Sequence, residues 1–261
     1  MNEQENVDAL LLEVEAAMTR AGLSAELIVV DDGSSDETLA RLNEHLIHRP
    51  WLRVLHWATP RGQSAALGAG IEAARAPFIA TLDADLQNDP ADMSELLQRV
   101  RRGEADMAQG VRRNRNDNLL RRLSSRIGRA ARLLILGDTI TDTGCSTRVV
   151  RAELARRLPL QFAGMHRFLP AYARMLGATV VEVDVRHHIR RAGATKYSVR
   201  NRAITGLVDC FILRWMRHRI RSLDFETSTD NADRPAATRG THEGVPTELP
   251  QRKVTQGGAR S

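Results

Sequence analysis

The chain has 261 residues, of which 42% are hydrophobic and 27% are charged, and its formal net charge is +6. This length supports one large domain or two small ones, and the composition excludes a fully disordered, collagen-like or disulfide-rich chain. Two cysteines form no disulfide framework, which favours a reducing compartment, and charges interrupt every apolar stretch before it could span a membrane. Almost all of the positive charge comes from arginine, and it predicts an anionic partner. The alternative is that these arginines only cover an ordinary solvated surface.

Short apolar strands alternate with helices through the first half of the chain. In chain order we predict a strand at Glu26–Asp31, a helix at Asp36–Ile47, a strand at Leu52–His56, a helix at Gly62–Ala74, a strand at Pro77–Leu82, a helix at Pro90–Arg102 and a strand at Ala105–Val111. Continuous apolar strands that alternate with helices are typical of a parallel sheet covered on both faces. Ligands of such sheets bind at the carboxyl ends of the strands.

The helix predicted at Val199–Arg221 is basic and amphipathic. Its apolar residues, among them Phe211 and Trp215, follow helical spacing, and arginines surround them. Such a helix can lie in a membrane interface; packing on the protein core or on a second copy is the alternative. Residues 222–261 are rich in Thr, Gly, Pro, Asp and Arg, so we expect a disordered polar tail after a single domain at 1–221.

Two acidic clusters follow predicted strands, at Val30–Asp36 and at Asp83–Gln87. In an extended segment the side chains of Asp83, Asp85 and Gln87 fall on the same side. Two carboxylates and an amide oxygen suit Mg²⁺ or Mn²⁺, with the remaining positions left to water and phosphate oxygens. The alternative is that these aspartates only cap helices and stabilise turns.

The order of these motifs resembles the family 2 glycosyltransferases with a GT-A fold, and more narrowly the dolichol-phosphate mannosyltransferase group with its bacterial polyprenyl-phosphate relatives. Besides the two acidic clusters, the segments that carry the resemblance are Asn2–Asn6, Arg61–Gln63, Gln109–Arg112, Asp142–Cys145 and His187–Tyr197. The resemblance implies an α/β, Rossmann-like GT-A domain, with a mostly parallel sheet flanked by helices. It also implies an inverting, metal-dependent transfer of sugar from a nucleotide-sugar to a polyprenyl phosphate of the dolichyl or undecaprenyl type.

The same resemblance implies roles for individual residues. Asp83, Asp85 and Gln87 would hold Mg²⁺ or Mn²⁺ on the donor diphosphate and so act as the catalytic set. The nucleotide would be contacted by Glu3, Val30, Asp32, Asp83, Ala84 and Asp85. The acceptor phosphate would be gripped by Arg112, Arg126, Arg190 and Lys196. The physical chemistry agrees, because metal and guanidinium groups must neutralise the phosphates that meet in one site.

The acceptor determines whether a general base is needed. A phosphate monoester, with a second pKa of about 6, is largely ionised at neutral pH and can attack the anomeric carbon without a base. We therefore name no catalytic base, and for Asp142 a turn or packing role is at least as well supported. The alternative is a family 2 enzyme with a glycan or lipid hydroxyl acceptor. Intact Asp83 and Asp85 argue against a non-catalytic subunit, and the absence of any nucleic-acid-binding motif argues against nucleic acid as a partner.

The sequence departs from the family at its start. Relatives open with an apolar strand followed by Pro-x-Tyr-Asn-Glu, and Met1 stands where the Tyr would be. We therefore expect a protein that begins upstream of Met1, with a truncated inactive copy as the alternative. The implied location is cytoplasmic and peripheral, on the inner face of the cell membrane. The sugar and the nucleotide stay open.

Overall fold

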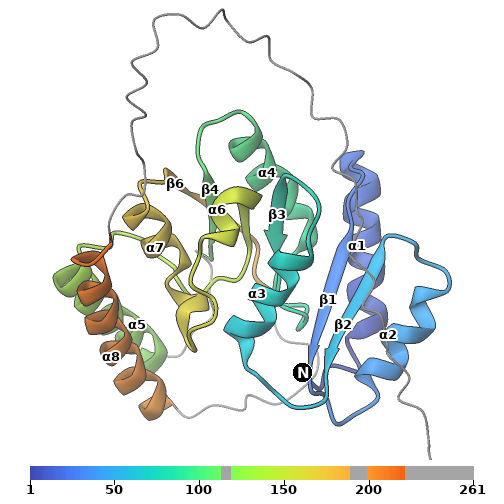
Figure 1. The fold of residues 1–261 in the computed structure, drawn as a ribbon, viewed down its shortest axis with the longest axis horizontal. Helices are drawn as coiled ribbons and strands as arrows, with labels where there is room; N and C mark the ends of the chain where they lie inside the picture. Colours follow the sequence, from blue (N-terminus) through green and yellow to red (C-terminus); the bar gives the residue numbers. More distant parts are fainter. Residues whose placement is uncertain (113–118, 189–198, 221–261) are drawn as a thin grey trace, which may run out of the picture. The chain divides into compact units, whose positions relative to one another are not determined.

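The computed structural model describes residues 1–112, 119–188 and 199–220; the tail predicted at 222–261 lies outside the described residues. Strands and helices alternate as predicted (Figure 1). The described strands are β1 (Leu27–Asp32), β2 (Leu52–Trp57), β3 (Phe78–Thr81), β4 (Met107–Val111), β5 (Arg148–Arg151) and β6 (Val180–Asp184). The helices are α1 (Val7–Ala21), α2 (Thr38–Leu46), α3 (Gln63–Ala73), α4 (Met93–Arg101), α5 (Leu119–Leu136), α6 (Ala152–Arg156), α7 (Leu169–Met175) and α8 (Val199–Arg217), with short 3₁₀ turns η1 (Pro90–Asp92) and η2 (Met165–Arg167).

The described strands form two sheets. Strands β1 and β2 pair in parallel, and a second sheet has the order β3-β5-β4-β6. In that sheet β5 runs antiparallel to β3 and β4, whereas β4 and β6 are parallel, so β3, β4 and β6 share one direction. The prediction of a mostly parallel sheet flanked by helices is confirmed, and β5 is the strand that departs from it.

Helices cover both faces of the four-stranded sheet. On one face, Leu96 and Val100 of α4 pack with Val149 of β5. The next residue of β5, Val150, points to the other face and joins a larger cluster that includes Leu169 of α7. Burial of each such side chain contributes about 1.5–3 kcal/mol, so these two layers fix the sheet and the loops at its strand ends.

The strands β1 and β2 have their own helical cover. Leu11 of α1 and Leu42 of α2 pack with Leu52 of β2, and Figure 1 shows these helices beside the strand pair. Helix α3 contacts β1. A Cβ built at Gly70 of α3 would lie only 3.4 Å from Cγ2 of Val30, so small residues let α3 approach β1 closely. This packing holds the first turn of α3 against the carboxyl end of β1.

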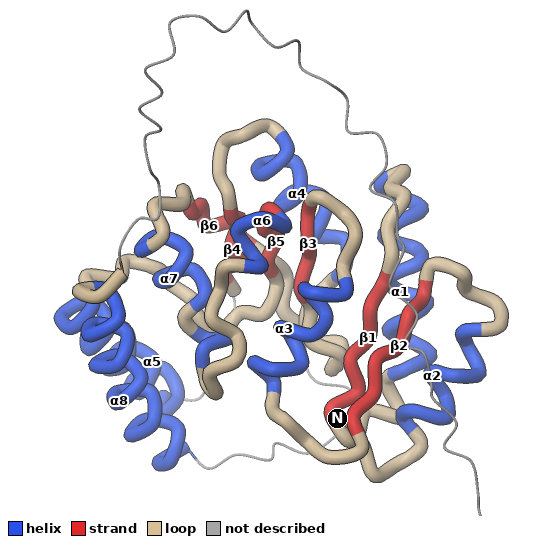
Figure 2. Tube along the Cα trace, viewed as in Figure 1, coloured by secondary structure: helices blue, strands red, loops and turns tan. Residues whose placement is uncertain are grey.

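Helices α5 and α8 pack side by side (Figure 2). Nη1 of Arg214 donates to the carbonyl of Ile135 at 2.7 Å, and Nη1 of Arg217 donates to the carbonyl of Leu136 at 2.9 Å. The α8 arginines therefore satisfy carbonyl groups at the end of α5, which have no partner within their own helix. Across the described ranges, no helix combines the length and the apolar character needed to cross a membrane.

Candidate active site

The carboxyl end of β1 holds two adjacent aspartates in different environments. Asp31 is buried, bonded to the Ser34 hydroxyl, and its Oδ2 lies 2.8 Å from Nδ1 of His56. Asp32 instead accepts hydrogen bonds from the backbone N–H groups of Arg61, at 2.6 Å, and Gly62, at 2.9 Å. Asp31 thus braces the turn after β1, while Asp32 joins that turn to the segment that leads into α3.

The loop after β3 carries the second acidic cluster. Leu86 has φ +58°, a left-handed conformation that costs a non-glycine residue about 1–2 kcal/mol. Its side chain is buried with Leu10 and Val14 of α1, and this packing holds the turn in place. Oδ1 of Asp85 accepts the backbone N–H of Gln87 at 3.2 Å. The strained turn keeps the acidic segment at the end of β3.

The first residue of α3 reaches this segment. Nε2 of Gln63 donates to Oδ1 of Asp83 at 3.0 Å. Burial and the neighbouring Asp85 charge raise the pKa of Asp83, and Ser146, Arg148 and Arg112 act in the opposite direction without cancelling that rise. Burial and a neighbouring carboxylate both disfavour the ionised form of Asp83, and a cation bound to the pair would favour it.

A divalent cation fits this donor set. In the part of the chain that the structure describes, no three His, Cys, Asp or Glu side chains converge as metal ligands. The protein would therefore provide only part of the coordination of the ion, through the carboxylates of Asp83 and Asp85. The amide oxygen of Gln87 is the predicted third ligand. Mg²⁺ and Mn²⁺ accept such partial protein ligation, because water and phosphate oxygens complete their coordination.

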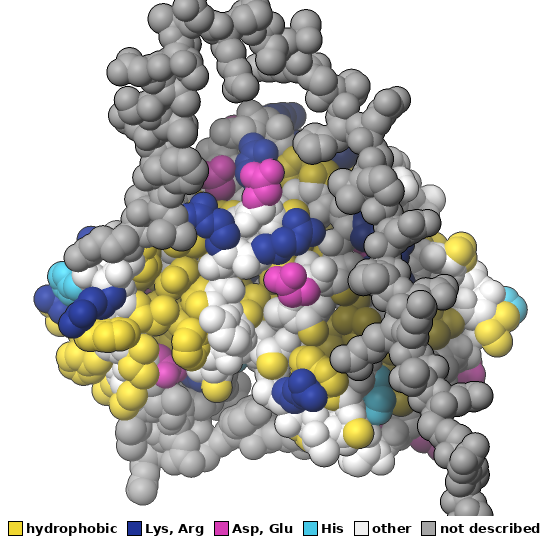
Figure 3. Space-filling view, in the orientation of Figure 1, with side chains coloured by type: hydrophobic (Ala, Val, Ile, Leu, Met, Phe, Trp, Pro, Cys, Tyr) yellow, Lys and Arg dark blue, Asp and Glu magenta, His cyan; other side chains and the backbone are white. Residues whose placement is uncertain are grey.

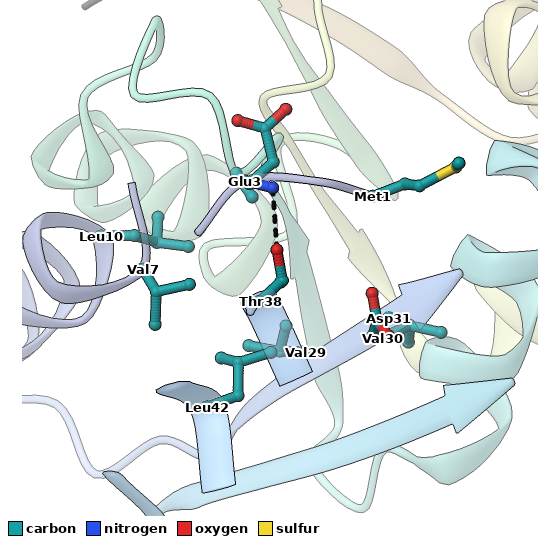
Figure 4. Close-up of a pocket in the computed structure, with 10 residues that line it drawn as sticks. Met1, Glu3, Val7, Leu10, Val29, Val30, Asp31, Thr38 and Leu42 are labelled. Atoms are coloured by element: carbon teal, nitrogen blue, oxygen red, sulfur yellow. Dashed lines mark hydrogen bonds between the residues drawn. The ribbon is translucent and has the colours of Figure 1, made fainter. Parts of the chain in front are cut away.

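A pocket lies between the start of α1, β1 and the acidic loop (Figure 4). Glu3, Val30 and Ala84, predicted to contact the nucleotide, all line it. The backbone N–H of Glu3 donates to Oγ1 of Thr38 at 2.9 Å, and Nδ2 of Asn6 donates to Oε2 of Glu3 at 2.6 Å. These bonds fix the first loop against the turn after β1. Their role in nucleotide binding stays a prediction.

Of the four basic residues predicted to grip an acceptor phosphate, Arg112 has a described side chain. Its Nε and Nη2 atoms donate to Oδ2 and Oδ1 of Asp142 at 2.7 and 2.9 Å. Burial opposes the charge, but this carboxylate raises the pKa of Arg112 above its ordinary value. Arg126 lies on α5 with its side chain outside the described part, and Arg190 and Lys196 lie outside the described residues.

Arg148, which the sequence did not single out, is buried close to the acidic pair. Its Nε donates to Oε1 of Gln109 at 2.6 Å, and its Nη2 donates to the carbonyl of Thr143 at 3.2 Å. Nε2 of Gln109 donates in turn to the carbonyl of Cys145 at 3.1 Å. Burial lowers the pKa of Arg148 to about 10, which leaves it a cation at neutral pH. The network fixes the loop before β5 to strand β4.

The fold and the acidic strand ends together define a GT-A type α/β protein. The chain belongs to glycosyl transferase family 2, whose family model matches residues 1–158. Among solved structures, glucosyl-3-phosphoglycerate synthase from Mycobacterium tuberculosis matches with a TM-score of 0.61 and 18% identity, over 85% of this chain and 79% of that one. A mannosyltransferase from Pyrobaculum calidifontis, solved with GDP-Man and Mn²⁺, matches with a TM-score of 0.55 and 14% identity, over 80% of this chain and 61% of that one.

Two curated relatives share more sequence with the chain. Dodecaprenyl-phosphate galacturonate synthase of Rhizobium johnstonii is 36% identical over 225 residues, which cover 84% of this chain and 66% of the relative. Undecaprenyl-phosphate 4-deoxy-4-formamido-L-arabinose transferase of Edwardsiella ictaluri is 32% identical over 200 residues, 76% of this chain and 61% of the relative. The chain thus spans less than two thirds of the length of either relative.

Proposed function

We propose that this protein transfers a sugar, with inversion, from a nucleotide-diphosphate sugar to a polyprenyl phosphate at a membrane surface. The observation that carries the proposal is the close pair of carboxylates, Asp83 and Asp85, at the end of β3, with Ala84 between them lining the pocket beside β1. One curated relative is named for the synthesis of a polyprenyl-phosphate galacturonate, and the other as an undecaprenyl-phosphate transferase of a modified arabinose. The family assignment supports the reaction class, and the relatives support the acceptor class.

On the donor side, Asp83, Asp85 and Gln87 would hold Mg²⁺ or Mn²⁺. The ion, when bound, supplies positive charge that stabilises the departing diphosphate. Glu3, Val30 and Ala84 would contact the nucleotide from the pocket of Figure 4, and Asp32 would do so from the end of β1. The solved relatives include a synthase from M. tuberculosis bound to Mn²⁺ and UDP-glucose, which makes Mn²⁺ the first ion to test.

On the acceptor side, the phosphate of the lipid would act as the nucleophile without a general base. Arg112, Arg126, Arg190 and Lys196 would bind it. The guanidinium of Arg112 is held by two hydrogen bonds to Asp142. It would therefore contribute its positive charge from a fixed position and would not move toward the lipid. We assign Asp142 to this ion pair and not to proton transfer, since a carboxylate held by a guanidinium is a weak base.

Peripheral attachment to the inner face of the membrane is part of the proposal. Hydrophobic side chains gather over α5 and α8 in Figure 3. Among the described side chains of these helices, the large exposed hydrophobic ones are Leu133, Leu134, Leu207, Val208, Phe211, Ile212 and Trp215. The guanidinium of Arg219 lies 5.6 Å from the Trp215 ring, next to this apolar face. Apolar side chains beside arginines suit the headgroup region of an anionic bilayer better than a second, equally basic copy.

Nucleotide binding to the purified protein tests the donor side. We expect Mn²⁺ together with UDP or GDP to raise the melting temperature, because a ligand bound to the native state adds stability by mass action. Asp85→Ala should abolish the shift. Glu44→Ala on the exposed face of α2 is the matched control and should preserve it. No shift with UDP, GDP, CDP or ADP would contradict the proposal.

Sedimentation with lipid vesicles tests the membrane surface. Wild-type protein should sediment with vesicles that contain phosphatidylglycerol and stay in the supernatant with phosphatidylcholine alone. A double change of Phe211 and Trp215 to Ser should lower the partition constant for the vesicles at least about 30-fold, since each side chain is more than half exposed and contributes on the order of 1–2 kcal/mol when inserted. Equal binding of the variant would exclude this face.

A further inference from the structure

Three consecutive residues that lead into α3 contact both acidic clusters. The backbone N–H groups of Arg61 and Gly62 donate to Oδ1 and Oδ2 of Asp32, at 2.6 and 2.9 Å. The side chain of the next residue, Gln63, donates from Nε2 to Oδ1 of Asp83 at 3.0 Å. Asp32 ends β1, whereas Asp83 follows β3, and these two strands belong to different sheets. This short segment therefore bridges the two sheets at the proposed site.

The backbone of the segment is fixed. Gly62 has φ +93°, a conformation that residues with a side chain rarely adopt, and its carbonyl accepts the backbone N–H of Ala66 at 3.0 Å as α3 begins. The residue after Gln63 is anchored as well, because Ser64 is only 3% exposed and its Oγ accepts the backbone N–H of His166 at 3.2 Å. Gln63 thus extends from a rigid support, which a side chain that positions another group requires.

A second side chain also holds the Asp83 carboxylate. A hydrogen bond with the Ser146 side chain favours the ionised form of Asp83. Ser146 is itself anchored, because Nδ2 of Asn88 donates to its Oγ at 3.0 Å and Oγ1 of Thr81 donates to its carbonyl at 2.5 Å. Ser146 reaches the carboxylate from the loop before β5 and Gln63 from α3. Of these two contacts, the one from Gln63 ties the carboxylate to the end of β1.

We propose, on the basis of the function above, that Gln63 is a positioning residue for the sugar donor. Its bond to Oδ1 fixes the rotation of the Asp83 carboxylate, and so the direction in which that carboxylate offers its oxygens to Mn²⁺ or Mg²⁺. The two preceding N–H groups hold Asp32, a predicted contact of the nucleotide. Gln63 would therefore set the spacing between that contact and the cation on the diphosphate.

This role predicts an effect on the coupling between cation and nucleotide. The factor by which Mn²⁺ tightens the nucleotide equals the factor by which the nucleotide tightens Mn²⁺. Removal of the Gln63 amide leaves both acidic clusters in place but breaks the bond that fixes one relative to the other. The coupling factor should fall, whereas the affinity for nucleotide in the absence of Mn²⁺ should not change.

The experiment compares wild-type protein with Gln63→Leu and Gln63→Glu. Equilibrium dialysis measures the dissociation constant of UDP or GDP, whichever binds the wild type, in Mn²⁺ and in EDTA. We expect the coupling factor to fall about tenfold in Gln63→Leu, the lower end of the loss that follows removal of a partner of a metal ligand, because Ser146 still holds Asp83. The EPR signal of free Mn²⁺, followed with and without the nucleotide, gives the same factor independently.

Gln63→Glu separates positioning from direct ligation of the cation. Glutamate has the shape of glutamine but no donor, and it places a third carboxylate beside Asp83. A positioning role predicts a coupling factor at least as low as in Gln63→Leu. A side chain that binds the cation itself predicts a gain, because a carboxylate is a better ligand for Mn²⁺ than an amide oxygen.

Two controls identify a merely structural role. Gln98→Leu, at an exposed glutamine of α4, is the matched control and should keep the coupling factor within about twofold of wild type. Gln63 is exposed, so its variants should melt within about 2 °C of wild type in EDTA. A structural defect would instead lower the melting temperature and weaken the nucleotide equally with and without Mn²⁺.

Each outcome decides for or against the proposal. A coupling factor within about twofold of wild type in Gln63→Leu, an equal loss of affinity in Mn²⁺ and EDTA, or a gain in Gln63→Glu would overturn the positioning role. If wild-type protein binds no nucleotide, or binds it equally in Mn²⁺ and EDTA, the proposed metal-dependent function itself fails, and the role of Gln63 fails with it. Binding by wild type that depends on Mn²⁺, together with unchanged variants, removes the role of Gln63 and leaves the proposed function standing.

Discussion

Two charged clusters lie close together in this molecule and are balanced in opposite ways. In the acidic pair, Asp83 and Asp85 repel each other, and burial raises the pKa of Asp83 further. In the basic network, Arg112 is paired with Asp142 through two hydrogen bonds, and Arg148 is bonded to Gln109 and a carbonyl. The first cluster brings two like charges together, whereas in the second each arginine is held by acceptors of opposite charge or by neutral oxygens.

The difference shows which cluster is built for a ligand. In the basic network each guanidinium is already held by acceptors of the protein, so the network serves first as a rigid support, from which Arg112 would add its charge to the acceptor site. Two carboxylates close to each other are stabilised when a cation binds between them, and the cation in turn attracts a diphosphate. Substitutions in the acidic pair should therefore act mainly on ligand affinity, and substitutions in the basic network mainly on stability, through the hydrogen bonds that they break.

The largest effect is expected from Arg148→Met, which breaks the basic network. Methionine fills much of the space, but Oε1 of Gln109 and the Thr143 carbonyl lose their donor, and Asp83 loses a nearby positive charge. Each buried acceptor left without a donor costs about 1–3 kcal/mol, and removal of a buried cation whose pKa the fold lowers offsets part of that cost, so we expect a net loss of about 2–4 kcal/mol. Urea unfolding should show a loss of that size. A loss below about 1 kcal/mol would contradict the assignment of the network as structural.

Asp83→Asn should have the opposite signature. We expect the affinity for Mn²⁺ with nucleotide to fall about 100-fold, because a carboxylate ligand is lost. The free energy of unfolding of the metal-free protein at pH 7 should not fall, and it should rise if anything. The sign follows from the raised pKa of Asp83: the folded state disfavours its ionised form, so an uncharged isostere removes a penalty.

Calorimetric titration and urea unfolding of the same Asp83→Asn sample check both parts. The matched control is Asp92→Asn, on η1 outside the pair, whose carboxylate pairs with Arg186. This control should keep the affinity for nucleotide. A destabilised Asp83→Asn protein with intact nucleotide binding would reverse the roles of the two clusters.

The sequence predicted best where the signals are local. Strands at Leu27–Asp32 and Leu52–Trp57 and the helix at Gln63–Ala73 lie within two residues of their predicted bounds, because apolar runs end at turn residues. Strand β5 was not predicted, since its four residues begin and end with arginine. Helix α1 was also missed, although Gly22, with φ +60°, ends it as a C-cap glycine does.

In the candidate site, too, residues with a local sequence signal could be chosen from the sequence, and residues brought together by the fold could not. Asp83, Asp85 and Gln87 could be chosen as candidates because their spacing lies within one short segment. The extended conformation assumed for that choice is wrong, because residues 84–86 form a turn with Leu86 at φ +58°, and the ligand set stays a prediction. Ser64 and His166 are 102 residues apart, and Gln109 and Arg148 are 39 apart, so only tertiary packing brings each pair together. A single sequence holds no signal for such pairs. The roles assigned by family resemblance stay predictions until the binding experiments are done.

The smallest loss of stability is expected from Asp142→Asn, which weakens the basic network but leaves Arg112 with an acceptor. The asparagine keeps one acceptor oxygen for Arg112, so the loss should be about 1–2 kcal/mol, smaller than for Arg148→Met. Nucleotide affinity should not change, in contrast to Asp83→Asn. Because the substitution removes a negative charge beside Arg112, farnesyl phosphate should bind about threefold more tightly at low salt if Arg112 faces the acceptor.

That affinity is the sharpest part of the Asp142→Asn prediction. Ion pairing with Asp142 and attraction of an acceptor phosphate draw on the same guanidinium charge, so weakening one should favour the other. Arg112→Lys is the companion variant, since lysine keeps the charge but loses the two-pronged geometry. A weaker affinity for farnesyl phosphate in Asp142→Asn, measured by titration at 20 and 200 mM salt, would instead mean that the ion pair orients Arg112 for the acceptor and that its geometry matters more than its free charge.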